Sequence, residues 1–494
     1  MRAWPEHPAI YEINARVWLH DLGHWLGTPV NFSTVPPEEW DRIADLGFDA
    51  VWFMGAWERS PAGAAAALRD AALLADFQRA LGDFTADDVV GSAYCVRRYV
   101  VDDALGGPAG LAEARRQLAA RGVRLLLDYV PNHVAVDHPW AAAHPEYFVH
   151  GTGEDLRREP ASFFAAGGGR VLAHGRDPNF PAWQDVLQLN AFDPGLRGAA
   201  AATVQEIAAQ CDGVRCDMAM LMMNDIFERT WGPRAGARPA DDFWPPLIAA
   251  VRQRHPAFRF LAEAYWDLEG ALLGQGFDDC YDKTLYDRLA HGDAEDVRRH
   301  LLADPSFQRR LARFIENHDE PRAAATFPPD KTRAAAVTLL TLPGAKLLHE
   351  GQLEGRKVRV PVSLGRRPPE LPDRDLAAFY ERLLPAARDG VFRDGLWRLC
   401  ERTGWPDNSS HLNILAWSWE AGGQRRLIVV NFSGVTSQAM VRLPWGDLGG
   451  RPWHLDDALS EDLFERDGDE LQAAGLFVSL DPWRWHFLRL MTDG

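Results

Sequence analysis

Acidic side chains stand at the ends of several short apolar stretches in this sequence. Asp217 closes the stretch Gly-Val-Arg-Cys-Asp, and Arg215 stands two residues before it. Side chains alternate along a strand, so Arg215 and Asp217 point the same way if this stretch is extended. An arginine beside a carboxylate keeps it ionised at neutral pH, which suits a nucleophile or a charge stabiliser. A purely structural Arg–Asp pair is the alternative for this stretch taken alone.

A second acid, Glu263, has a different setting. It lies in Leu-Ala-Glu-Ala-Tyr-Trp, among apolar neighbours of the kind that a proton donor needs. A third acid, Asp319, directly follows His318. Hydrolysis of a glycosidic bond needs one carboxylate at the anomeric carbon and a second acid that protonates the leaving oxygen. These three acids, with His133 and His318, favour glycoside hydrolysis if the fold brings them together at one end of its strands.

The elements that would position these residues form a regular series. Eight strand-like stretches alternate with helical patterns, at residues 10–18, 49–54, 123–129, 213–217, 258–264, 277–281, 313–317 and 345–349. This alternation predicts an α/β protein with a (β/α)8 TIM barrel, in which catalytic side chains gather at the carboxyl ends of the strands. A doubly wound sheet is the competing topology, but the Gly-rich phosphate turn that usually follows its first strand is missing.

Two parts of the chain depart from this alternation. Residues 134–190 show no long regular element, which predicts an inserted subdomain after the third strand. After residue 391 short β-type runs follow one another, which predicts a C-terminal antiparallel β-sandwich domain. The expected domains are therefore a barrel in two parts, 1–133 and 191–390, the inserted domain 134–190, and the β domain 391–494.

The residues considered so far belong to four short motifs that follow one another along the chain. They are Asp-Tyr-Val-Pro-Asn-His at 128–133, Gly-Val-Arg-Cys-Asp at 213–217, Leu-Ala-Glu-Ala around Glu263, and Phe-Ile-Glu-Asn-His-Asp at 314–319. In order and spacing they resemble the four motifs of the α-amylase superfamily, glycoside hydrolase family 13. The resemblance covers about residues 8–360 and extends to the β tail. It implies that 134–190 is the inserted domain B of that family and the C-terminal sheet its domain C.

The resemblance implies a role for each of the site residues. Asp217 would be the catalytic nucleophile and Glu263 the general acid/base. Asp319 would bind and distort the sugar in the reacting subsite, and Arg215 would orient Asp217. Retention of the α configuration through a double displacement is also implied by the family.

Three further residues would hold the same sugar. By the resemblance, His133 and His318 bind its hydroxyl groups, and Tyr94 stacks on its ring. Tyr94 lies in Gly-Ser-Ala-Tyr, where the family usually has proline in place of Ala93.

The chain departs from the family pattern at two other places. Met220 and Leu221 stand where the family often has Lys-His after the nucleophile, and Gln188 stands where it often has an Asp. Both places help to build the usual calcium site and the outer sugar contacts of the family. Asn132 remains, but one ligand does not make a calcium site. We therefore expect no metal and no cofactor, and no typical endo-acting, starch-liquefying amylase.

Composition limits the partners of the protein. The formal charge is −17 and no basic stretch offsets it, which argues against nucleic acid. The five cysteines form no CxxC pair, which is typical of buried thiols in a reducing compartment. Neither a signal peptide nor a membrane span is visible, so a cytoplasmic protein is expected. An oligo- or polysaccharide is the expected partner, and the sequence leaves the oligomeric state undetermined.

Several alternative functions are compatible with these site residues. The first is a retaining α-glycosidase acting on α-glucans or α-glucosides of the maltodextrin or glycogen type. The second is a transglycosylase or isomerase with the same site, made more plausible by the absent Lys-His pair. A non-catalytic carbohydrate-binding protein would have lost an acid, and a metal-dependent hydrolase would use His133, Asp217, Glu263 and His318 as ligands. Anion binding near Arg322 is left open.

Overall fold

The computed structural model describes residues 3–460 and 462–492. Its centre is a closed barrel of eight parallel strands in the order β1-β15-β14-β13-β12-β11-β5-β2. The strands are β1 (Ala9–Asn14), β2 (Ala50–Met54), β5 (Arg124–Tyr129), β11 (Gly213–Cys216), β12 (Arg259–Ala262), β13 (Asp279–Tyr281), β14 (Leu311–Arg313) and β15 (Ala345–His349). The predicted (β/α)8 barrel is confirmed, and the doubly wound sheet is wrong.

The barrel strands form because their sequences are apolar on both faces. All residues of β2, Ala-Val-Trp-Phe-Met, are buried, as are those of β15. Helices follow the strands, among them α1 (Ala15–Leu26), α5 (Gly107–Ala120), α8 (Pro194–Gln210), α10 (Trp244–Arg254), α12 (Lys283–His291) and α16 (Pro329–Thr341). Asp193 caps α8 by accepting from the backbone N–H of Leu196, and Pro194 opens the helix.

Two of the predicted strands differ from the observed ones by more than two residues at one end. The stretch 10–18 is a strand only as far as Asn14, because the Asn14 side chain accepts from the backbone N–H of Val17 and caps α1. The predicted stretch 313–317 shares only Arg313 with the observed strand, which runs from Leu311 to Arg313. Asn317 Oδ1 accepts from the backbone N–H groups of Asp319 and Glu320, at 2.9 and 2.8 Å, and turns the chain there.

The described chain divides into two compact units. The first contains 11–281 and 358–369, and the second contains 4–10, 282–357 and the chain from Glu370 onward. Strands β2, β5, β11, β12 and β13 belong to the first unit, and β14 and β15 belong to the second.

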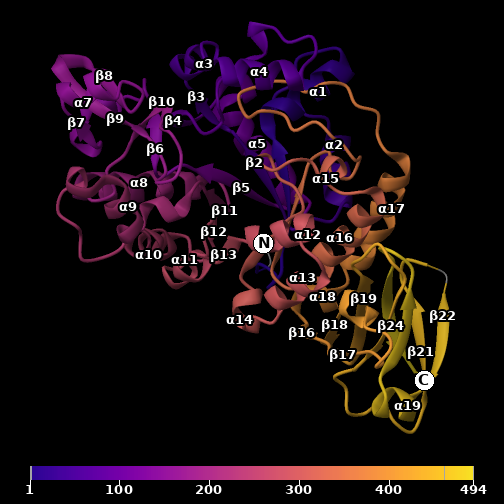
Figure 1. Ribbon diagram of the computed structural model, residues 1–494. Coiled ribbons are helices and arrows are strands. Elements are labelled where there is room, and N and C mark those ends of the chain that lie inside the picture. Colours follow the sequence, from indigo (N-terminus) through magenta and orange to yellow (C-terminus); the bar gives the residue numbers. More distant parts are fainter. Residues whose placement is uncertain (1–2, 461, 493–494) are drawn as a thin grey trace. The chain divides into compact units, whose positions relative to one another are not determined.

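A small sheet follows β5 in the first unit (Figure 1, magenta). Its strands are β6 (His133–Ala135), β7 (His150–Gly151), β8 (Phe163–Ala166), β9 (Arg170–Gly175) and β10 (Trp183–Gln188). Their order is β6-β10-β9-β7, with β8 paired to β9. Phe148, Leu172 and Leu187 pack together in its core. The segment thus has regular structure that its sequence did not indicate, because each strand is too short for a clear pattern. The domain boundaries given above stay a prediction.

Two antiparallel sheets make up the C-terminal part of the second unit (Figure 1, orange to yellow). One has the order β16-β18-β19-β24-β21-β22 and the other β17-β20-β23. The strands are β16 (Leu396–Leu399), β17 (Arg402–Thr403), β18 (Ile414–Ala421), β19 (Gln424–Asn431), β20 (Ser437–Val441), β21 (Pro452–Asp457), β22 (Leu463–Asp467), β23 (Leu476–Leu480) and β24 (Trp485–Met491). Leu427 from the first sheet and Val478 from the second share one core, which confirms the predicted β domain.

Among the described residues we find no helix whose length and apolar character would let it span a bilayer.

Candidate active site

Arg215 is the centre of the candidate site. Its side chain is fully buried, and it lies on β11, which pairs in parallel with β5 and β12. Arg215 Nη1 donates to Asp217 Oδ1 at 2.7 Å. Arg215 Nη2 lies 2.8 Å from Glu263 Oε2, an ion-pair distance at an angle that does not make a hydrogen bond. One guanidinium therefore holds both of the predicted catalytic acids.

The two acids lie where their strands end. The backbone N–H of Asp217 donates to the carbonyl of Tyr129, and the N–H of Glu263 donates to that of Cys216, at 2.9 and 3.0 Å. These bonds continue the parallel ladders of β5, β11 and β12 by one step. Asp217 and Glu263 are 6% and 3% exposed, so both are almost fully shielded from water.

Three aromatic rings surround Arg215. Its guanidinium carbon lies 5.1 Å from the ring centre of Tyr94, 5.4 Å from that of Trp52 and 5.6 Å from that of Tyr281. Burial lowers the pKa of Arg215, but Glu263 and the other neighbours outweigh it and hold this pKa well above its ordinary value. Arg215 is therefore a permanent cation with Tyr94 beside it, and the stacking of Tyr94 on a sugar stays a prediction.

Glu263 has polar partners on both oxygens. The backbone N–H of Met218 donates to Oε2 at 2.6 Å, and the Tyr265 hydroxyl donates to Oε1 at 2.8 Å. The expectation of apolar surroundings is wrong for these atoms, because Leu261 and Ala262 belong to the buried strand while the carboxylate lies beyond it. The carboxylate is thus fixed in place from both sides.

The backbone next to both acids is in an unusual conformation. Met218, directly after Asp217, has φ 40°, and Trp266 and Asp267, shortly after Glu263, have φ 62° and 59°. Left-handed backbone is costly for residues other than glycine, and such strain gathers at functional sites. The Met218 N–H at this turn donates to Glu263.

His133 opens β6 and is 5% exposed. Burial lowers the pKa of His133 to about 4, against the raising influence of Asp185 and the Tyr94 backbone, so the ring is neutral at neutral pH. Asn132 Nδ2 lies 3.3 Å from His133 Nδ1. An amide nitrogen only donates, so Nδ1 is the acceptor and Nε2 carries the proton. Tyr94, Arg215, Asp217 and Glu263 form one connected group, and His133 belongs to the same unit.

His318 and Asp319 belong to the second unit. His318 Nε2 lies 2.9 Å from Asp319 Oδ2. His318 is 2% exposed, whereas the Asp319 side chain is 43% exposed. Their approach to Asp217 and Glu263 stays a prediction of the sequence.

The sequence left undetermined whether an anion binds near Arg322. In the structure Arg322 contacts groups of the protein itself. It is 2% exposed, and its Nη1 lies 2.6 Å from Glu316 Oε1. The same nitrogen donates to the carbonyl of Glu350 and lies 2.9 Å from His349 Nδ1. Arg322 thus stabilises the loop after β14, and an anion would have to displace a buried carboxylate.

The donor set argues against a metal centre at this site. In residues 3–460 and 462–492, no three His, Cys, Asp or Glu side chains are arranged to hold a metal ion. The Arg215 guanidinium lies between Asp217 and Glu263. A metal-dependent mechanism would use these two acids as ligands. A metal ion between these two acids would have to displace that buried cation.

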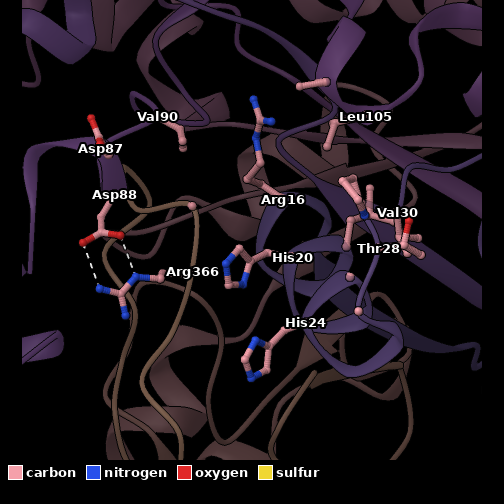
Figure 2. Close-up of a pocket in the computed structure, with 16 residues that line it drawn as sticks. Arg16, His20, His24, Thr28, Val30, Asp87, Asp88, Val90, Leu105 and Arg366 are labelled. Atoms are coloured by element: carbon pink, nitrogen blue, oxygen red, sulfur yellow. Dashed lines mark hydrogen bonds and ion pairs between the residues drawn. The ribbon is translucent and has the colours of Figure 1, made fainter. Parts of the chain in front are cut away.

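A separate cavity of about 630 Å³ lies along α1 in the first unit (Figure 2). Arg16, His20, His24, Asp88 and Arg366 are among its lining residues, and none of the predicted site residues is. Figure 2 shows Arg366 paired with Asp88, at 2.5 Å between Nε and Oδ1. Arg16 in turn pairs with Asp102 at 3.3 Å. The arginines of this cavity are therefore engaged by carboxylates of the protein.

Sequence reasoning missed three residues that contact the site. They are Trp52, Tyr265 and Tyr281, whose rings or hydroxyl groups touch Arg215 or Glu263. Tyr281 is the last residue of β13, so an aromatic residue at a barrel strand end was the available signal for it, whereas Trp52 lies in the middle of β2.

The fold and the site together define a class of protein. It is the (β/α)8 barrel whose neighbouring strands present two acids bridged by an arginine at their carboxyl ends. No family model matches the chain. The α-amylase MalA of Haloarcula japonica is 26% identical over 373 residues, which are 72% of this chain and 45% of that protein. The chain spans about half the length of the curated relatives it matches.

Two solved structures resemble the chain over nearly its whole length. A maltogenic α-amylase from Thermotoga neapolitana matches with a TM-score of 0.70 and 17% identity, over 99% of both chains. A trehalulose synthase from Pseudomonas mesoacidophila matches with a TM-score of 0.67 and 16% identity, over 99% of this chain and 100% of that one. At these identities the likeness concerns the fold. Together with the four sequence motifs and the sequence relatives, these likenesses support the α-amylase superfamily.

Proposed function

We propose that this chain is a retaining α-glycosidase that acts on α-glucans or α-glucosides of the maltodextrin or glycogen type. The observation that carries the proposal is the Arg215 guanidinium, which holds Asp217 and Glu263 at 2.7 and 2.8 Å at the ends of neighbouring strands. The α-amylases among the relatives support the substrate class.

In the first step Asp217 attacks the anomeric carbon while Glu263 gives its proton to the glycosidic oxygen. The bond between the anomeric carbon and that oxygen breaks, and a covalent ester with Asp217 forms. In the second step Glu263 takes a proton from water, which attacks the same carbon and releases Asp217. Two inversions retain the α configuration. Arg215 keeps Asp217 ionised before it attacks and again after its release, and Tyr265 and the Met218 N–H orient Glu263.

The sugar itself would be held by residues around this pair. Tyr94 offers a ring face for stacking, and the neutral His133 offers one donor nitrogen for a hydroxyl group. By the family resemblance, Asp319 would also bind this sugar, and the buried His318 would orient Asp319.

A transglycosylase or isomerase with the same site is the second candidate. One observation favours it: the segment after the nucleophile, Ala219–Met222, is buried and apolar, with Met220 at 0% and Leu221 at 3% exposure. It offers no charged side chain to a leaving sugar or to an entering acceptor. The choice between water and a sugar as acceptor then depends on the surrounding loops.

The test is incubation with a series of maltooligosaccharides, with and without added glucose as acceptor, and chromatography of the products. Shorter oligosaccharides of α configuration would support the hydrolase, and longer or rearranged products would support the transferase. Asp217→Asn and Glu263→Gln should each lower kcat by at least about 1000-fold. Full activity in Asp217→Asn would overturn the mechanism. No turnover of any α-glucan or α-glucoside by the wild type would overturn the function.

Other properties also belong to the proposal. The four domains keep the boundaries given from the sequence. A cytoplasmic location is supported by five cysteines that are all free and buried. A saccharide is the proposed partner, and the acidic net charge speaks against nucleic acid.

A further inference from the structure

Gln188, the last residue of β10, makes an unusual set of contacts. Its side chain is fully buried, and its Nε2 donates to three oxygens: the carbonyl of Asn132 at 2.9 Å, the Asn132 Oδ1 at 2.8 Å and the carbonyl of Leu189 at 3.0 Å. Gln188 Oε1 accepts from the backbone N–H of Arg176 at 3.3 Å. A reversed amide would point its oxygen at three other oxygens, so the contacts fix its orientation.

These three oxygens come from two segments that are far apart in sequence. Asn132 follows β5 of the barrel, and Leu189 follows β10 of the small sheet. The backbone N–H of Leu189 also donates to the carbonyl of Asn132 at 3.0 Å. The Gln188 amide therefore joins the small sheet to the barrel at the point where the chain leaves one and returns to the other.

Asn132 and the residue at 188 are the places where the family resemblance implies calcium, and the residues present do not fit that ion. Calcium binds six to eight oxygens at about 2.3–2.6 Å, usually with carboxylates among them. Here the converging oxygens are uncharged, and a nitrogen that carries hydrogens lies at their centre. An ion at this point would have to displace the Gln188 amide and leave its donors buried and unpaired.

We propose that the Gln188 side-chain amide takes the place of the calcium ion, so that the junction of small sheet and barrel is independent of calcium. The amide also acts as a positioning residue, a part of the proposal that rests on the proposed function. Because Asn132 Oδ1 accepts from Gln188, Asn132 Nδ2 faces His133 Nδ1 at 3.3 Å. Gln188 thus determines which nitrogen of His133 carries the proton and is presented as a donor.

The first test measures the Tm of the whole protein in EDTA and in millimolar calcium. The wild type should have the same Tm in both. Gln188→Asp removes the amide and places a carboxylate near the three oxygens, so its Tm should fall in EDTA and recover in calcium. Gln188→Leu should lose roughly 5 °C in both buffers, because the oxygens lose their donor and gain no ion.

A wild type whose Tm falls in EDTA, or a Gln188→Asp variant that calcium does not restore, would overturn the proposal. If Gln188→Asp does not fold in EDTA, its refolding on addition of calcium is the supporting result, and failure to refold is the contrary one.

The second test examines positioning. Histidines labelled with a heavy nitrogen isotope give separate signals, and the one lost in His133→Gln identifies His133. Its Nδ1 should be unprotonated in the wild type and should change in Gln188→Leu. Gln308→Leu is the matched control, since Gln308 is also buried and donates to the carbonyl of His300 at 2.7 Å. It should lower Tm and leave the His133 signal unchanged. An unchanged signal in Gln188→Leu would overturn the positioning role. Neither test needs a substrate, so failure of this proposal can be distinguished from failure of the proposed activity.

Discussion

Met218 donates its backbone N–H to Glu263 Oε2 at 2.6 Å, and it does so from a left-handed conformation with φ 40°. The residue directly after the proposed nucleophile thus holds the proposed proton donor. Asp217 and Glu263 are coupled through the main chain as well as through Arg215, so a change at one acid reaches the other.

The Tyr265 hydroxyl should matter for catalysis more than for stability. Tyr265→Phe removes the donor to Glu263 Oε1, so kcat/KM should fall roughly 10-fold while Tm changes little. Steady-state kinetics on a maltooligosaccharide and a thermal melt provide the two readouts. Tyr147→Phe, at a partly buried position packed against the core of the small sheet, is the control and should keep wild-type kinetics. A Tyr265→Phe variant with unchanged kcat/KM would show that Glu263 needs no such support.

Removing Arg215 should be severe for both activity and stability. Arg215→Ala leaves the buried Asp217 and Glu263 without their shared cation, which should cost about 3–5 kcal/mol and abolish turnover. Denaturant unfolding and product release measure the two effects. Arg215→Lys can pair with only one of the carboxylates and should recover some stability with little activity. Stability equal to wild type in Arg215→Ala would mean that the ion pairs contribute no net free energy.

Stability should fall in weak acid because of His138, a histidine that follows β6. Burial lowers the pKa of His138 to about 4, with Arg97 lowering it and Asp137 raising it. Its Nδ1 accepts from the backbone N–H of Trp140 at 3.0 Å, which requires the neutral ring. Unfolding therefore takes up a proton between about pH 6.5 and 4, and stability declines as pH falls through this window, by up to ~3 kcal/mol.

Urea unfolding at a series of pH values measures this decline. His138→Asn keeps a side-chain acceptor and cannot gain a proton, so its decline should be shallower than that of the wild type. His24→Gln, which changes an exposed histidine, should follow the wild-type curve. Equal slopes in His138→Asn and the wild type would rule out His138 as the cause.

The cysteines should be inert in the folded protein. All five are free and buried, and burial raises the pKa of Cys211 and of Cys400 to about 12 and that of Cys95 and Cys216 well above the ordinary value. A thiol reagent at neutral pH should label none of them until denaturant is added, and then all of them. Rapid labelling of a native thiol would show that its surroundings open.

Local patterns in the sequence accounted for much of the barrel and for part of the site. Apolar runs predicted β2 and β15 because strands buried on both faces leave no room for polar residues. The pairing of Arg215 with Asp217 follows from alternation along one strand. The start of α1 was missed because the Asn14 cap competes with a β-rich stretch, and the small sheet was missed because its strands are short.

By itself, then, the sequence determined the motifs, the strand order along the chain and the pairing of residues that are neighbours in one strand. Only the tertiary structure decided that Glu263 meets Arg215, because this contact depends on parallel pairing that sets Arg215 opposite Leu261. The same holds for Gln188 and Asn132, which are 56 positions apart in the chain. Contacts between segments depend on the register and closure of sheets, and these are fixed by the packing of the whole fold rather than by any local pattern.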